Sequence, residues 1–233
     1  MNAAAGRLQA IRERIQAACA RAGRQSREVR LIAVSKKQPA SAVQALYDLG
    51  VREFGESQIQ EALPKIAQLA RDDIQWHFIG HLQSNKTREI PGHFHWVHAV
   101  DSVRLATRLS TAAGTAAGTE PLNLLLQVNV ARDPAKHGLQ PDRLYDVVDE
   151  LMRQDLPGVA LRGLMTIGFQ DADDFQARAS FAALRDLLEG CRQRFGASFT
   201  ELSMGMSDDF ETAIEEGATM VRVGTALFGS RGP

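Results

Sequence analysis

The chain has 233 residues, of which 44% are apolar, and this is enough to bury the core of one domain of barrel size. It carries 27 lysines and arginines against 28 acidic residues, so its net charge of −1 gives no electrostatic basis for binding nucleic acid or an anionic membrane. Its two cysteines, Cys19 and Cys191, lie in separate helical patterns without CxxC spacing, which excludes a disulfide framework and a cysteine zinc site. The expected partner is a small molecule or another protein.

The N-terminus has no apolar core of the signal-peptide kind, and no apolar run is long enough to cross a bilayer. We therefore expect a soluble, cytoplasmic protein that does not bind membranes. The sequence shows no zipper pattern that would join two copies, so a monomer is expected.

The first elements of the chain are a helix, a strand and a second helix. Apolar residues from Leu8 to Ala22 recur at helical spacing and stop before Gly23, which predicts a helix within residues 1–23. Residues 29–35, VRLIAVS, form a short β-branched run that predicts a strand ending just before Lys36. Pro39 then opens a helix that reaches Gly50.

The unit of strand and helix recurs along the rest of the chain. Further strands are predicted at 51–54, 75–79, 96–100, 122–130, 160–166, 200–204 and 219–223. Helical patterns separate most of them, notably Leu144 to Met152 and Phe175 to Phe195. Pro64 is expected to kink or break the helix after the second strand, and the stretch rich in alanine, glycine and threonine from Thr111 to Thr119 is expected to be a surface loop.

Eight strands alternating with helices predict an α/β fold of the TIM-type (β/α)8 barrel, with a doubly wound open sheet as the alternative. Several strands, such as LNLLLQVNV, are continuous apolar runs, as a parallel sheet covered on its outer face requires. We expect residues 1–233 to form a single domain. Little of the chain follows the eighth strand, so the helix within 1–23 is expected to pack where a final helix would normally lie.

Functional groups in such a barrel collect where the strands run into the following loops. Lys36 ends the first strand, and partial desolvation there would lower its pKa and free its amine to form a Schiff base. Taken alone, Lys36 and Lys37 are more typical of a solvated pair. The Schiff-base hypothesis therefore depends on the other strand ends.

The ends of the last two strands supply candidate ligands for a phosphate group. After the seventh strand, SMGMSDDFE offers Gly205 for close backbone approach and Ser207 as a hydroxyl donor and helix cap, with two aspartates in the first turn. After the eighth strand, RVGTALFG places Gly224 and Thr225 where backbone N–H groups and a hydroxyl can bind phosphate oxygens. Each motif alone is equally consistent with a tight turn and an ordinary cap.

Arg222 lies two residues before Gly224, so both face the same side of the strand, inward if Gly224 contacts a ligand. A buried arginine needs a partner, which is either an acidic side chain or the aromatic nitrogen of a cofactor. A lysine for an aldehyde, an arginine for a ring nitrogen and donors for a phosphate are the groups that pyridoxal 5′-phosphate (PLP) requires. The sequence therefore predicts PLP bound covalently through Lys36.

Three histidines close in sequence, His93, His95 and His98, are candidate metal ligands. His95 and His98 fall on opposite faces of a strand, and no carboxylate or cysteine at ligand spacing completes the set. We therefore expect no metal site. His77 and His81 flank the end of the third strand, where we expect satisfied or solvated histidines.

Six segments in order along the chain carry a resemblance to a known family: LIAVSKKQP, FGESQIQE, WHFIGHLQSNK, LRGLMTI, LSMGMSDDFETAI and MVRVGTALFG. With them the chain resembles the pyridoxal phosphate homeostasis proteins, whose fold is similar to the N-terminal barrel of alanine racemase. The resemblance implies that Lys36 is the Schiff-base lysine and that Arg222 faces the pyridine nitrogen. It also implies that Ser207, Gly224 and Thr225 bind the phosphate.

The family often has asparagine where this chain has Ser57, and Ser57, His81 and Lys37 are given no role. An arginine at the ring nitrogen leaves the pyridine a weaker electron sink. Racemases of similar fold add a β-rich domain and take a tyrosine base from a neighbouring subunit. Here Tyr47 and Tyr145 fall in helical patterns, and the chain has no residues left for such a domain.

We therefore expect a PLP-binding protein without catalytic residues, which stores the cofactor or delivers it to PLP-requiring apo-enzymes and so contributes to vitamin B6 homeostasis. Two alternatives stay open. One is a small PLP-dependent amino-acid racemase or lyase with Lys36 as anchor and base. The other is an aldolase-type barrel whose Schiff base forms with a sugar phosphate.

Overall fold

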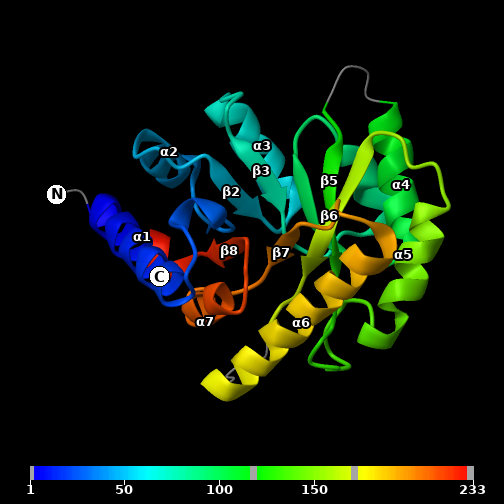
Figure 1. The fold of residues 1–233 in the computed structure, drawn as a ribbon. Helices are drawn as coiled ribbons and strands as arrows, with labels where there is room; N and C mark the ends of the chain where they lie inside the picture. The colour runs from blue at the N-terminus through cyan, green and yellow to red at the C-terminus, as the bar shows by residue number, and fades with distance from the viewer. Residues whose placement is uncertain (1–2, 116–119, 169–172, 230–233) are drawn as a thin grey trace.

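The structure, a computed structural model, describes residues 3–115, 120–168 and 173–229 and contains a closed barrel (Figure 1). Its parallel strands pair in sequence order, and the first pairs with the last. They are β1 (Arg30–Val34), β2 (Glu53–Glu56), β3 (Gln75–Phe78), β4 (Trp96–Val100), β5 (Leu122–Gln127), β6 (Val159–Met165), β7 (Glu201–Ser203) and β8 (Met220–Val223). All eight predicted strands and the barrel are confirmed. An open doubly wound sheet is excluded, because it would leave two unpaired edges.

One helix precedes the first strand, and helices follow most of the strands. They are α1 (Ala3–Arg21), α2 (Ala40–Asp48), α3 (Ile59–Leu69), α4 (Val103–Gly114), α5 (Leu144–Met152), α6 (Asp174–Phe195), α7 (Phe210–Glu215) and α8 (Thr225–Phe228), with the short 3-10 helices η1 (Ser26–Glu28), η2 (Ser84–Glu89) and η3 (Pro141–Arg143). The start of α6 is set by a capping box, in which the Asp173 side chain accepts from the Gln176 N–H and the Gln176 side chain accepts from the Asp173 N–H. Within the described ranges, no helix has both the length and the apolar character needed to cross a membrane.

The N-terminal helix covers the region where the barrel closes. It packs against α7, α8 and α2, and Figure 1 shows it in blue beside the orange and red C-terminal elements. Leu8, Ile11 and Ile15 recur every three to four residues on its buried side, which gives it one apolar face. The expectation that this helix packs on the barrel is confirmed, and α8, with its four residues, covers only part of the closure.

Two local predictions, a break at Pro64 and a loop from Thr111, are wrong. The helix α3 continues without a break through Pro64, because its buried side, including Ile59 and Ala62, is held against the barrel. The predicted loop from Thr111 to Thr119 begins as the last turn of α4, since residues 111–114 are helical and Ala113 is buried. Residues 116–119 lie outside the described residues.

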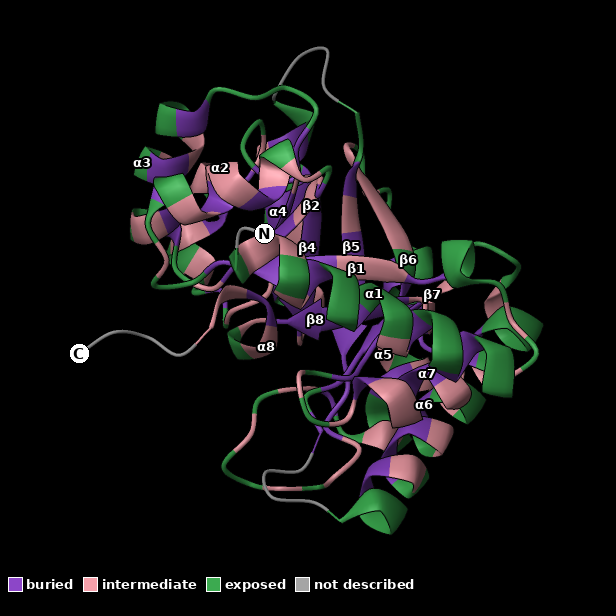
Figure 2. Cartoon of the chain, turned by 90° about the vertical axis from the view of Figure 1, so that its left-hand side faces the viewer, coloured by how far each residue is buried: buried purple, intermediate pink, exposed green. Residues whose placement is uncertain are grey.

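The core has two parts, and Figure 2 shows buried residues gathered in the strands and on the inner sides of the helices. A large cluster fills the layer between strands and helices. A smaller one lies inside the barrel and consists of Ile32, Trp96, Ala99, Leu125, Met165 and Met220. Arg222 lies two positions after Met220 on β8, so it also faces the interior. The interior is therefore apolar only in part.

Candidate functional site

The pairing of β1 with β8 brings the first and last parts of the sequence together. Ile32 lies opposite Arg222 in the parallel register, so Gly224 comes level with Val34. A Cβ built on Gly224 would lie 3.5 Å from the Val34 Cβ, which agrees with this register. Lys36 follows Val34 by two residues. It therefore leaves the barrel beside the end of β8.

The end of β7 lies on the other side of β8. The backbone N–H of Arg222 donates to the Gly205 carbonyl at 3.0 Å, which aligns the residues after β7 with β8. Ser207 follows Gly205 by two residues, and Thr225 follows the end of β8. Lys36, Ser207 and Thr225 thus follow three neighbouring strands at the same end of the barrel, where functional groups collect in this fold.

Lys36 is exposed, so the partial desolvation expected from the sequence is not present. Its side-chain amine makes no hydrogen bond or ion pair with the part of the chain that the structure describes. An amine in this position is accessible to an aldehyde from solution.

Ser207 is half-buried and does not cap a helix, so that prediction is wrong. The helix α7 begins only at Phe210, and Asp209 is its N-cap residue. The Asp209 Oδ1 accepts a hydrogen bond from the Met206 N–H at 2.6 Å and so closes the turn that contains Ser207. The Ser207 hydroxyl is therefore not used for capping.

The two glycines of the predicted phosphate site, Gly205 and Gly224, differ in whether the fold requires glycine at their position. Gly205 has a φ of +88°, and a Cβ there would lie 2.5 Å from the Ala213 Cβ, so packing against α7 requires glycine. Gly224 is the N-cap of α8, and a Cβ there would make only ordinary contacts with the protein. The first N–H groups of α8 have no partner within the helix, and Thr225, its first residue, is exposed. This strand end offers donors that fit a phosphate group.

Arg222 is 5% exposed and is held by two neutral acceptors. Its Nη1 donates to the Ser203 Oγ at 2.7 Å and its Nη2 donates to the Thr166 carbonyl at 2.8 Å. Burial lowers the pKa of Arg222 to about 10, against the smaller opposing effect of the Asp209 charge, so the guanidinium is still protonated at neutral pH. No described carboxylate lies within ion-pair distance of Arg222, which excludes the acidic partner within these residues.

A chain of buried hydrogen bonds continues from Arg222 through the barrel interior. The Ser203 Oγ lies 2.8 Å from the His98 Nδ1, the His98 Nε2 lies 2.9 Å from the His77 Nδ1, and the His77 Nε2 lies 2.5 Å from the Glu53 Oε2. Because arginine can only donate, the Ser203 hydroxyl accepts from Arg222 and donates to His98. In turn, His98 donates to His77 and His77 donates to the Glu53 carboxylate. Each imidazole then carries one proton, with its tautomer assigned from its partners.

The two histidines in this series of hydrogen bonds, His77 and His98, are fully buried. Burial lowers the pKa of His98 well below its usual value, and the nearby His77 and Arg222 lower it further. Burial also lowers the pKa of His77, although Glu53 opposes the shift. From the sequence we expected only that His77 would be satisfied or solvated. The overlooked signal was polar residues at inward positions of three successive strands, of which Glu53 is the first.

These buried histidines make the protein sensitive to acid. In the unfolded chain a histidine gains its proton near pH 6.5, whereas His77 and His98 in the folded chain remain neutral at that pH. The unfolded state therefore binds more protons, and the free energy of unfolding is expected to fall as the pH drops below about 6.5.

Urea unfolding between pH 7.5 and pH 5 measures this effect. His98→Asn is expected to flatten the dependence, whereas His93→Asn at an exposed position should leave it unchanged. A wild-type free energy of unfolding that stays constant over this range would contradict the neutral assignment.

The three histidines close in sequence do not converge. His93 is exposed, and His95 accepts a hydrogen bond from the Trp76 N–H at 3.0 Å. His98 lies in the barrel interior and is occupied as described above. These three histidines therefore do not form a common site.

A different trio, His81, Asp101 and His137, brings its potential ligand atoms within 4.8 Å of one another. The rings of His81 and His137 are stacked, with centroids 3.9 Å apart and planes 14° from parallel. Their nitrogen lone pairs lie in nearly parallel planes and do not point to one ion. The two histidines thus form a stacking contact between the connections after β3 and β5.

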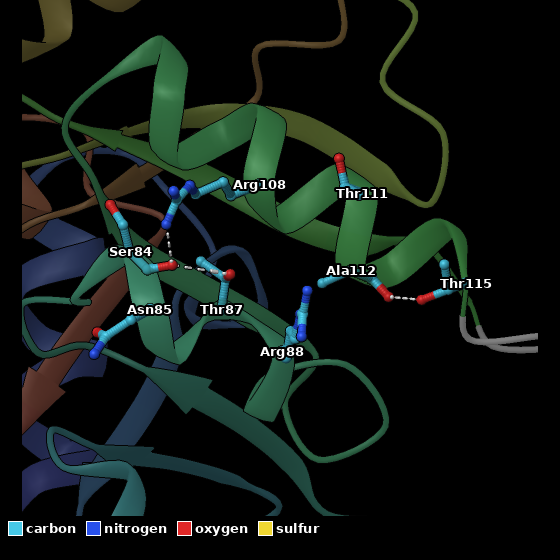
Figure 3. Close-up of a pocket in the computed structure, with 8 residues that line it drawn as sticks. All are labelled: Ser84, Asn85, Thr87, Arg88, Arg108, Thr111, Ala112 and Thr115. Atoms are coloured by element: carbon cyan, nitrogen blue, oxygen red, sulfur yellow. Dashed lines mark hydrogen bonds between the residues drawn. The ribbon is translucent and has the colours of Figure 1, made fainter.

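A cavity of about 700 Å³ lies between η2 and α4, away from the strand ends that carry Lys36 and Thr225. Arg88 and Arg108 line it (Figure 3), and Arg108 donates to the Ser84 carbonyl at 2.9 Å. Between β3 and β4, a stretch that the structure describes in full, the chain forms only η2, a short 3-10 helix, and no α-helix. None of the predicted site residues lines it.

Comparison with known proteins is consistent with this fold. The family described as "Alanine racemase, N-terminal domain" matches residues 7–232. The "Pyridoxal phosphate homeostasis protein" of Pseudomonas aeruginosa is 48% identical over 231 residues, covering 99% of this chain and 97% of that protein.

Two solved structures show how far the likeness extends. PipY of Synechococcus elongatus, in a structure described as having PLP bound, is 39% identical with a TM-score of 0.84, and the match covers 97% of this chain and 100% of that one. Alanine racemase from Corynebacterium glutamicum is 18% identical with a TM-score of 0.67, and the match covers 96% of this chain but only 62% of the racemase. The second likeness concerns the fold alone.

Proposed function

This chain belongs to the pyridoxal phosphate homeostasis proteins, within the alanine racemase N-terminal domain family, and from that membership we propose that it binds PLP as a Schiff base through Lys36. The observation that supports the proposal is the strand register, which brings the segment that carries the exposed Lys36 beside the end of β8. PLP would supply an aldehyde for the amine and a pyridine ring that withdraws electrons.

The residues around Lys36 fit the other two parts of the cofactor. The hydroxyls of Ser207 and Thr225 and the N–H groups at the start of α8, next to Gly224, would bind the phosphate. Arg222 would donate to the pyridine nitrogen. Its guanidinium is protonated at neutral pH and would not pass its proton to the ring, so the ring would be a weak electron sink.

The tyrosines support binding over turnover. Tyr47 lies in α2 and its hydroxyl donates to Asp73 at 2.8 Å, and Tyr145 lies in α5 with Arg194 over its ring. Neither lies at a strand end of the barrel, so neither is placed to serve as a second base. We therefore infer that the protein holds PLP for storage or for delivery to PLP-requiring apo-enzymes.

The proposal is tested by adding PLP to the purified protein and recording its visible spectrum, then assaying it with a panel of amino acids. We expect a Schiff-base absorbance band and no sustained racemisation or cleavage. Robust turnover would instead identify a small racemase or lyase. A protein that stays colourless with PLP but forms a reducible adduct with sugar phosphates would favour the aldolase-type alternative.

A further inference from the structure

A group of charged residues lies behind the segment that carries Lys36. Glu56 is fully buried at the end of β2 and Lys65 is 6% exposed on α3. The Lys65 Nζ lies 2.6 Å from the Glu56 Oε1 and 3.3 Å from the Glu61 Oε1. Both glutamates come from the segment FGESQIQE, and the proposed PLP contacts use neither of them.

This group holds the two peptide groups on either side of Lys36. The Ser35 carbonyl, which belongs to the peptide before Lys36, accepts from the Lys65 Nζ at 2.9 Å. The Lys37 N–H, which belongs to the peptide after Lys36, donates to the Glu61 Oε1. Peptide groups are planar, so holding both of them sets the direction of the Lys36 Cα–Cβ bond.

The holding groups are themselves linked. Glu61 and Lys65 are one turn apart on α3, which puts their side chains on the same face of the helix. The fully buried Ser35 also donates its hydroxyl to the Glu56 Oε1 at 2.6 Å. The end of β1 is thereby fixed through a backbone group and a side chain at once.

Two features indicate that this arrangement is not explained by stability alone. The Glu56 Oε2 is buried and has no hydrogen-bond partner in the described part of the chain, which is unfavourable for a carboxylate. Lys37 has a φ of +60°, a left-handed conformation that costs energy for a residue with a side chain. The contacts hold the segment in a conformation that it would not prefer by itself, as is common at functional sites.

We infer that Glu56, Glu61 and Lys65 are positioning residues that direct the Lys36 amine to the carbonyl carbon of an aldehyde ligand. This inference rests on the proposed function. In the reaction, the amine nitrogen forms a double bond to the aldehyde carbon and the aldehyde oxygen leaves as water, so no further reactant is needed. None of the three residues contacts the Lys36 amine, and they act through the backbone beside Lys36.

The test removes one holding contact with little disturbance elsewhere. Glu61 is the most exposed of the three, and Glu61→Ala removes the acceptor of the Lys37 N–H. We expect the equilibrium constant for Schiff-base formation with PLP to fall at least about tenfold. Glu61→Gln keeps an acceptor oxygen and should restore most of it. Gln68→Ala, at an exposed position of the same helix, is the matched control and should match the wild type.

A second measurement separates positioning from general damage. In a Lys36→Ala background, PLP can bind only without the covalent bond, and Glu61→Ala should then leave its affinity unchanged. An equal loss in both backgrounds would overturn the inference. In the protein without PLP, the amide hydrogen of Lys37 should exchange faster in Glu61→Ala than in Gln68→Ala.

The possible failures are distinguishable. A wild-type protein that forms no Schiff base at any PLP concentration overturns the proposed function together with this inference. A wild-type Schiff base that persists unchanged in Glu61→Ala overturns the positioning role alone.

Discussion

Replacing Lys36 with alanine is expected to abolish the Schiff-base absorbance band of the PLP-loaded protein. Lys36 is exposed beside the end of β8, and its amine has no partner among the residues described. PLP would still reach the phosphate donors near Ser207 and Thr225, so weak noncovalent binding should remain. We expect the apparent affinity to fall at least about tenfold, or about 1.4 kcal/mol.

The matched control is Lys37→Ala, which removes the next lysine, also exposed, but keeps the backbone N–H that donates to Glu61. It should keep the absorbance band. Borohydride reduction followed by peptide mass analysis should place the PLP adduct on Lys36 in the wild type and in Lys37→Ala. An adduct that persists in Lys36→Ala, or that maps to another lysine, would contradict the assignment.

Gly163→Ala is expected to destabilise the barrel strongly. Gly163 on β6 lies opposite Glu201 on β7, and a Cβ built on it would lie 2.0 Å from the Glu201 carbonyl oxygen. The neighbour is backbone and the barrel is closed, so neither strand can shift without disturbing the others. Overpacking of this kind costs about 3 kcal/mol of unfolding free energy, which urea unfolding would measure.

Gly6→Ala provides the contrasting change. Gly6 lies in α1, and a Cβ there would meet nothing within 4 Å. In a helix, alanine is more favourable than glycine by about 1 kcal/mol of free energy, so this variant should be slightly more stable than the wild type. Equal stabilities of Gly163→Ala and the wild type would show that β6 and β7 are farther apart than described.

The eight strands could be predicted from local signals, namely apolar runs in strands such as β1 and β5 and the regular alternation of strand and helix patterns along the chain. The signal was less reliable at the element ends. The fifth strand ends at Gln127 although its apolar run continues to 130, because the backbone after it turns toward Leu139. The predictions at Pro64 and at residues 111–114 failed for a related reason. Packing against the barrel outweighed the local preference for a break in the helix or for a loop.

The partners of Arg222 could not be predicted. The sequence left open an acidic side chain or a cofactor, whereas the structure provides the Ser203 hydroxyl and the Thr166 carbonyl. Ser203 then leads through His98 to residues on two further strands. These contacts depend on which inward-facing residues of neighbouring strands lie side by side in the closed barrel. The strand register decides this, and the spacing of residues along the chain does not.

The amino-acid sequence by itself determined the number of strands, their alternation with helices, and the positions of Lys36, Ser207, Gly224 and Thr225 at strand ends. Local periodicity and glycine and proline signals carry that information. Only the tertiary structure decided that β1 closes against β8, that the Lys36 amine is exposed, and that α3 holds the peptides beside it. These features are contacts between residues far apart in the chain, and they arise only when the closed barrel brings those residues together.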